Sequence, residues 1–199
     1  MRRDRRGGSP APWPSICRNV LERAIAVFCL DPLAIGGLWR RGRASPERDL
    51  VMAALRGALP LPERRLQAGI GDEALYGGIA LALTLASGRA EQRPGLLAEA
   101  SVLILPMAER AGAGLAARLA LALDGGRHGL VALDEAAGQD EGLAPALADR
   151  RGICLDLDGL RVADLADLTP DPGQLAAARA RLPGVGLAGE MIADLVAAA

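Results

Sequence analysis

Residues 33–49 read LAIGGLWRRGRASPERD, and this stretch decides the fold. Its first part, residues 33–44, is an apolar run that passes into a loop rich in Gly and Arg, as expected for a buried strand and the loop after it. Residues 47–59, ERDLVMAALRGAL, carry apolar side chains at helical spacing and are followed by Pro60 and Pro62. The stretch therefore predicts a strand, a loop and a helix, which is the setting of a phosphate-binding loop.

The loop matches the phosphate-binding pattern GxxxxGK[ST] poorly. Gly42 fits the first position, but Glu47 stands at the second Gly, Arg48 at the Lys and Asp49 at the Ser or Thr. A carboxylate beside the phosphates is unfavourable, and Arg is bulkier and differently shaped than Lys. On spacing alone, an ordinary strand–helix turn explains the loop better than a phosphate-binding loop does.

Two further residues of the loop bear on its chemistry. Pro46 removes one backbone N–H donor from the cradle. Ser45 has no base beside it in sequence, so nothing indicates a nucleophile. The candidate cofactor-binding residues are those of this degenerate loop: Gly42, Ser45, Glu47, Arg48 and Asp49.

Strands and helices alternate along the rest of the chain. Several strands are apolar on both faces, which indicates a parallel sheet covered by helices on both sides. We expect a disordered tail at residues 1–14, an α/β domain at 15–162 and a small, partial helical lid at 163–199. After the strand within 33–44, the expected strands are 64–70, 101–106, 130–135 and 153–159. The expected helices are 15–30, 47–59, 109–126, 142–150 and the segments after Pro172. Residues 71–89 should form a loop and then a helix, and residues 95–100 a short helical turn.

Composition excludes several functions. The 23 basic residues, all of them Arg, balance 24 acidic ones, so the surface excess of a general nucleic-acid binder is missing. The three Cys residues are widely spaced and form no CxxC pair, so no metal site is indicated. No apolar run reaches the roughly 20 residues needed to span a bilayer, and the N-terminus lacks a secretory signal. We therefore expect a cytoplasmic protein.

The order of segments resembles the ATPase-like domain of magnesium chelatase subunits, over roughly residues 15–199. The degenerate loop points to the D subunit of that family and not to the hydrolysing I subunit. The segments that carry the resemblance are DPLAIGGLWRRGRA (31–44), GIGDEALYGGIALALTLASGR (69–89), PGLLAEASVLILPMAER (94–110) and APALADRRGICLDL (144–157).

The resemblance implies a P-loop NTPase-like (AAA+) fold and a non-hydrolysing platform. Such a platform assembles with the I subunit and the porphyrin-binding H subunit, which insert Mg²⁺ into protoporphyrin IX in chlorophyll or bacteriochlorophyll biosynthesis. It implies at most weak binding of ATP and Mg²⁺, and that this chain corresponds to the N-terminal part of a D subunit. Two alternatives stay open: a divergent ATPase that uses Arg48, and a generic α/β interaction module.

Several residues test this resemblance. Where a working ATPase of the family has Asp-Glu at the end of a strand, this chain has Pro106 and Met107. We interpret Glu109 as an acid at a helix start, favoured there by the helix dipole. Asp134 and Glu135 follow the next strand; we expect them to be exposed acids at a strand end, and a cation site is the alternative.

By resemblance, Arg150 is a candidate arginine finger that acts on a neighbouring I subunit. The alternative is a surface ion pair of Arg150 with Asp149 or Glu141. His128, the sole histidine, has no nucleophile near it in sequence, and we expect it to be exposed to solvent. The sequence assigns no catalytic residue and no metal ligand with certainty.

Overall fold

The computed structural model describes residues 13–136, 142–157, 160–165, 168–186, 189, 191 and 197. Most of the expected tail therefore lies outside the described residues, as do Glu141 and much of the last expected helix. Within the described part of the chain, no helix is long and apolar enough to cross a membrane.

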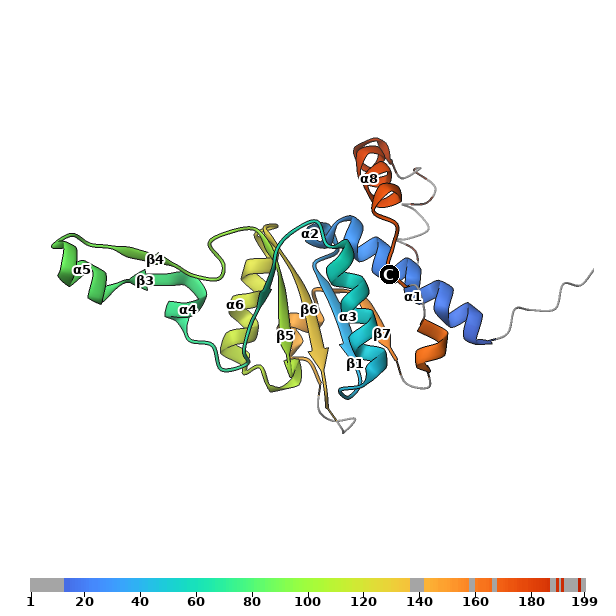
Figure 1. The fold of residues 1–199 in the computed structure, drawn as a ribbon, viewed down its shortest axis with the longest axis horizontal. Helices are drawn as coiled ribbons and strands as arrows, with labels where there is room; N and C mark the ends of the chain where they lie inside the picture. The colour runs from blue at the N-terminus through green and yellow to red at the C-terminus, as the bar shows by residue number, and fades with distance from the viewer. Residues whose placement is uncertain are drawn as a thin grey trace, which may run out of the picture.

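A five-stranded sheet forms the centre of the molecule, with the strand order β2-β5-β6-β1-β7 (Figure 1). Every neighbouring pair in it is parallel, as the sequence predicted. The strands are β1 (Gly37–Arg41), β2 (Glu63–Arg65), β5 (Ser101–Pro106), β6 (His128–Asp134) and β7 (Arg151–Asp156).

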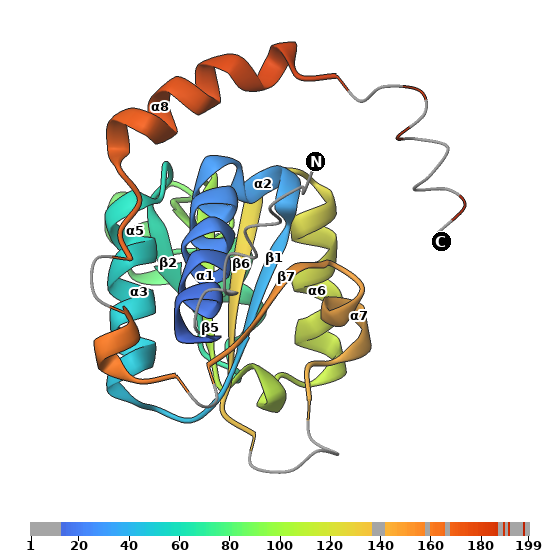
Figure 2. The same ribbon diagram turned by 90° about the vertical axis from the view of Figure 1, so that its right-hand side faces the viewer.

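Helices cover both faces of the sheet (Figure 2). Alternate side chains of β5 point to opposite faces: Val102 and Ile104 pack with α1 (Trp13–Leu30) and α3 (Pro46–Ala58), whereas Leu103 and Leu105 pack with α6 (Ala113–Asp124) and α7 (Pro145–Ala148). The two hydrophobic cores explain why this strand is apolar throughout.

A short helix, α2 (Pro32–Ile35), precedes β1 where the sequence predicted continuous strand. The carboxylate of Asp31 accepts a hydrogen bond from the amide of Ala34 at 3.0 Å, and Pro32 occupies the first helical turn. Both features favour a helix start. The prediction was correct that Asp31 and Pro32 end α1, but wrong that a strand begins directly after them.

An arm projects from one end of the molecule between β2 and β5 (Figure 1). It contains α4 (Asp72–Tyr76), β3 (Gly77–Ile79), α5 (Leu81–Ser87) and β4 (Gln92–Pro94), with β3 and β4 antiparallel. At its base, a Cβ on Gly95 would lie 2.2 Å from the amide nitrogen of Gly77, so only glycine fits this crossing. The expected helical turn at 95–100 is therefore wrong: the chain passes through a tight turn there.

The remaining helical elements complete the described chain. Helix α8 (Pro172–Arg181) lies over α1 at the far end of the molecule from the arm (Figures 1 and 2). Three short 3₁₀ helices are η1 (Ala108–Arg110), η2 (Val162–Leu165) and η3 (Leu182–Gly184).

Candidate functional site

The carboxyl ends of β1, β5 and β6 meet at one edge of the sheet, which is where ligands bind in open α/β folds. The loop of interest leaves this edge between β1 and α3. The amide of Gly42 donates a hydrogen bond to the carbonyl of Asp134 at 3.0 Å, so the loop is tied to the end of β6. Gly42 has φ +128°, a backbone conformation that favours glycine.

Helix α3 begins in an ordinary, well-capped way. The hydroxyl of Ser45 accepts a hydrogen bond from the amide of Arg48 at 3.3 Å, and Pro46 occupies the first turn. Glu47 and Asp49 lie in the same turn, where the helix dipole favours carboxylates. The negative charge at this helix start is therefore supplied by the chain itself.

The inner side of the loop binds a guanidinium. The side chain of Arg40 is buried, with 1% of the residue exposed. Its Nη1 donates to the carbonyl of Gly42 at 2.7 Å, and its Nη2 donates to the carbonyl of Arg43 at 3.0 Å. A phosphate-binding loop presents N–H groups to its ligand, whereas these two carbonyl oxygens face a cation. Arg40 belongs to no motif in the sequence, so this role was not predicted.

Arg48, at the position of the loop Lys, is paired within the chain. Its Nη1 donates to Oε1 of Glu135, the residue directly after β6, and its Nε lies 3.7 Å from Oδ1 of Asp49. The Arg48 and Glu135 side chains are 20% and 30% exposed, so solvent screens the pair only in part. The positive charge of Arg48, which would otherwise meet a phosphate, is already balanced by the carboxylate of Glu135.

Glu109 fixes the end of β6. Its carboxylate accepts a hydrogen bond from the amide of Glu135 at 3.1 Å, and its side chain is only 8% exposed. The expectation of a helix-start acid was incomplete, because Glu109 also anchors the residue that pairs with Arg48.

Asp134 is fully buried, so the expectation that it is exposed was wrong. Its Oδ2 accepts a hydrogen bond from Trp39 Nε1 at 3.1 Å, and its Oδ1 accepts one from the amide of Ala136 at 2.9 Å. All of β6 is buried because it is the central strand. Trp39 was the available signal in the sequence, since the N–H of a partly buried indole usually finds a hydrogen-bond acceptor.

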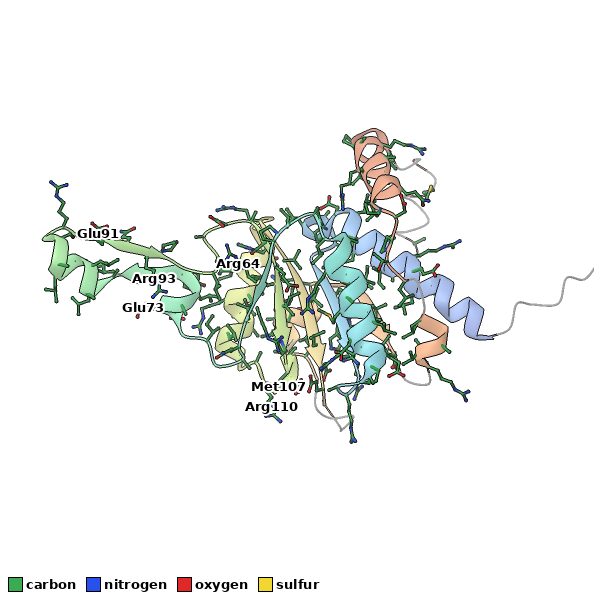
Figure 3. The ribbon with its side chains drawn as sticks, viewed as in Figure 1. Arg64, Glu73, Glu91, Arg93, Met107 and Arg110 are labelled. Carbon is green, nitrogen blue, oxygen red and sulfur yellow. The ribbon has the colours of Figure 1, made fainter. Side chains whose placement is uncertain are left out.

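Pro106 and Met107 stand at the end of β5, where the family pattern has two acids. Met107 has φ +50°, is 40% exposed, and lies beyond the strand end with Arg110 (Figure 3). Neither side chain is a ligand for Mg²⁺. Among the residues that the structure describes, no three His, Cys, Asp or Glu side chains come together as a metal site.

Arg150 lies at the opposite edge of the sheet, directly before β7. Its Nε and Nη2 donate to the two carboxylate oxygens of Asp124 at 2.7 and 2.5 Å, and its Nη1 donates to the carbonyl of Ala146 at 2.8 Å. The hydrogen bond from Arg150 lowers the pKa of the Asp124 carboxyl. The expected partner was Asp149 or Glu141; the ion pair is made with Asp124, and Glu141 lies outside the described residues.

His128 is buried, so the expectation of solvent exposure was also wrong. It begins β6 opposite Ser101, the first residue of β5, and their Nδ1 and Oγ atoms are 3.2 Å apart. Burial lowers the pKa of the imidazole. This pair lies at the edge of the sheet away from the loop and is enclosed, so it is a structural contact.

The chain is similar to two curated proteins. It is 49% identical over 184 residues to the magnesium-chelatase 60 kDa subunit of Cereibacter sphaeroides, and 48% identical over 178 residues to that of Rhodobacter capsulatus. These matches cover 92% and 88% of this chain but only 32% of each relative. The chain thus spans about a third of the length of these relatives. No protein-family model matches it.

Solved structures share the fold. A candidate ATPase from Cytophaga hutchinsonii superposes with a TM-score of 0.59 at 13% identity, over 89% of this chain and 67% of that one. A chain from a model of the complex between subunits BchI and BchD of magnesium chelatase superposes with a TM-score of 0.55 at 17% identity, over 82% and 73%. The fold is therefore similar to AAA+ ATPases, as predicted from the sequence.

Proposed function

Because the chain is homologous to about one third of the magnesium-chelatase 60 kDa subunit, we propose that it is a non-hydrolysing platform of a magnesium chelatase. In this role it docks the hydrolysing I subunit and, with it, the porphyrin-binding H subunit. The assembly inserts Mg²⁺ into protoporphyrin IX in chlorophyll or bacteriochlorophyll biosynthesis. In this proposal the α/β domain at residues 15–162 forms the platform.

The ion pair between Arg48 and Glu135 is the observation that carries this proposal. A triphosphate needs an available cation at the start of the helix, and here the carboxylate of the same chain already binds that cation. A phosphate would have to displace Glu135 and would then meet the carboxylates of Glu47 and Asp49 in the same turn. A loop of this kind disfavours nucleotide turnover.

Other residues at this edge do not fit a Mg²⁺–triphosphate either. The guanidinium of Arg40 occupies the loop carbonyls of Gly42 and Arg43. Pro106 and Met107 supply no oxygen ligand to orient the Mg²⁺ shell and no carboxylate to activate water. These features support a subunit that leaves hydrolysis to its partner.

The direct test mixes the purified chain with the I subunit, with and without ATP, and follows complex formation by sizing with light scattering. We expect a stable complex in at least one nucleotide condition, and no phosphate release by the chain alone. Absence of a complex under every condition would contradict the docking role. Phosphate release that disappears in Arg48→Ala would instead identify a divergent ATPase.

A further inference from the structure

The tip of the arm, residues 77–88, is an apolar surface that the described part of the chain leaves uncovered. Helix α5 has no buried residue, and its leucines Leu81, Leu83 and Leu85 are 67%, 61% and 75% exposed. Ile79, just before α5, is 61% exposed. Because Leu81 and Leu85 lie on one side of the helix and Leu83 on the other, the tip is apolar on more than one side. Such a surface needs an apolar partner.

The tip has no charged side chain, and its polar groups bond within the arm. Its two hydroxyl groups are those of Thr84 and Ser87. The hydroxyl of Thr84 accepts a hydrogen bond from the amide of Glu91 at 3.0 Å, and that of Ser87 donates to the carbonyl of Arg89 at 3.2 Å. Strand β3 pairs with β4, and the amide of Ala80 donates to the carbonyl of Glu91 at 2.8 Å. The tip therefore offers a partner few hydrogen-bonding groups.

The chemistry of the tip matches a lipid surface better than a groove on another protein. A specific contact between proteins has a polar rim and about one hydrogen bond per 100–200 Å². The interior of a bilayer has the opposite requirement, since it accepts segments without charge whose backbone polar groups are bonded internally. It also covers every side of an inserted element, whereas a groove covers one side.

The charged residues of the arm all lie outside its tip and nearly balance one another. They are Asp72, Glu73, Arg89, Glu91 and Arg93. Figure 3 shows Glu73, Glu91 and Arg93 along the arm. Asp72 forms an ion pair with Arg118 of α6, with an Nε–Oδ1 distance of 3.2 Å. Two cations and two carboxylates remain, so the arm has no excess charge with which to attract anionic headgroups. Insertion of the apolar tip must therefore determine the binding.

We propose that the tip of the arm inserts into one leaflet of a phospholipid bilayer. Tyr76, directly before the tip, is 53% exposed and lies where the uncharged tip meets the charged base, and tyrosine favours the membrane–water interface. Helix α5 has seven residues and is therefore about 10 Å long, comparable with the roughly 5–10 Å to which interfacial elements enter a bilayer. The contact uses neither the loop edge nor the I subunit, so it goes beyond the platform role proposed above.

The first test is flotation of the full chain with vesicles of phosphatidylcholine. Ile79 and the three leucines offer about ten exposed side-chain carbons, fewer than a myristoyl chain, so binding should be reversible, with a constant of at most about 10⁴ M⁻¹. The arm variant, Leu81→Glu with Leu85→Glu, should bind roughly tenfold more weakly or less, because a carboxylate enters hydrocarbon at high cost. Addition of phosphatidylglycerol should change the binding little, because the charges of the arm balance.

The matched control is Leu121→Glu on α6, a position outside the arm that is 69% exposed. It should bind vesicles as the wild type does. Circular dichroism checks that both variants keep the fold, which should tolerate a carboxylate at positions that are already exposed.

The second test places a fluorophore in the tip. Tryptophan emission of Leu83→Trp should shift to shorter wavelength with vesicles and should be quenched by lipids that carry bromine on their acyl chains. Leu121→Trp should show neither effect. Trp13 and Trp39 are present in both variants, so their emission cancels in the comparison.

Three outcomes would overturn the proposal. One is a wild type that stays in the aqueous fraction at roughly 10 mM lipid, well above the reciprocal of the expected constant. Another is binding that requires anionic lipid or survives in the arm variant. The third is a Leu83→Trp emission that vesicles leave unchanged. Complex formation with the I subunit is measured separately, so a chain that binds this subunit but not vesicles would refute the lipid contact and leave the platform role standing.

Discussion

The guanidinium of Arg179 on α8 binds the carbonyl of Cys29 at the end of α1, with an Nη2–O distance of 2.6 Å. The same side chain also donates to the carbonyls of Leu30 at 3.2 Å and Ala58 at 3.3 Å. Cys29 and Leu30 end α1, and Ala58 ends α3, so one cation satisfies the free carbonyls of two helix ends. Arg179 thereby connects α8 to the helix that follows the candidate loop.

Replacement of Arg179 by Ala should lower the free energy of unfolding by about 1–3 kcal/mol, because three hydrogen bonds to a charged donor are lost. Amide hydrogen exchange in residues 172–181 should rise more than in α3. Arg181→Ala is the matched control, since Arg181 lies on the same helix and is exposed. Equal exchange in the two variants would show that Arg179 does not hold α8 in place.

Cys29 offers a second measurement of the same contact. Burial raises the pKa of its thiol to about 11, while the nearby Arg179 opposes that shift. The folded chain should therefore react slowly with a thiol reagent at pH 8 at this position, because the thiolate is the reactive form. If Arg179→Ala loosens α8, modification of Cys29, followed by peptide mass spectrometry, should be faster than in Arg181→Ala. An unchanged rate would mean that burial in the core alone, and not the contact with Arg179, protects Cys29 from modification.

Glu135→Gln should strengthen phosphate binding at the loop. The substitution removes the carboxylate that balances Arg48 while it keeps the shape of the side chain. We expect ATP affinity, measured by calorimetry, to rise by roughly tenfold, which corresponds to about 1.4 kcal/mol. Glu63→Gln, which breaks the exposed pair with Arg56, should have no effect. Equal affinities in both variants would mean that another feature of the loop limits binding.

The stability of the chain should fall in acid through His128. Burial lowers the pKa of its imidazole below the ordinary value of 6.5, so the unfolded state binds the proton more readily than the folded state. This contribution is complete above pH 6.5 and is lost as the pH falls towards the folded pKa, with a slope of at most about 1.4 kcal/mol per pH unit. His128→Asn should flatten the denaturation profile between pH 7 and pH 5. A profile with the same slope would exclude His128 as its source.

Local pattern was enough to predict the central elements. The expected strand at 101–106 is β5, because a strand with both faces buried is continuously apolar. The expected helix at 47–59 is α3 within one residue at each end, since its spacing and its flanking prolines are local signals. The helix expected within 71–89 includes α5, but strands β3 and β4 of the arm were missed because they have three residues each, and several of these are Gly, Pro or charged.

The contacts of the candidate site could not be predicted in the same way. The positions of Gly42, Arg48 and Asp49 followed from a motif, but the partner of Arg48 is 87 residues away. That partner depends on β6 lying beside β1, which the strand order sets and the local sequence does not. The burial of His128 and Asp134 has the same origin, because both lie on the central strand. They are the first and last residues of that strand, so each has apolar neighbours on one side only, and the local sequence does not predict that they are buried.

Replacement of Arg150 tests whether this residue acts on a neighbouring subunit or only stabilises its own chain. If it acts on a neighbouring I subunit, Arg150→Ala should reduce the ATPase activity of the mixed complex at least tenfold, since arginine fingers contribute roughly a thousandfold or more to the rate. Complex formation, followed by light scattering, should persist, because the pair with Asp124 is partly exposed and contributes little to stability. Arg151→Ala is the neighbouring control, since that guanidinium lies 4.7 Å from the ring centre of Trp39. Asp124→Asn should keep the activity, because it weakens the internal pair and leaves Arg150 available. Full activity of the complex with Arg150→Ala would leave Arg150 a structural role alone, through its contacts with Asp124 and Ala146.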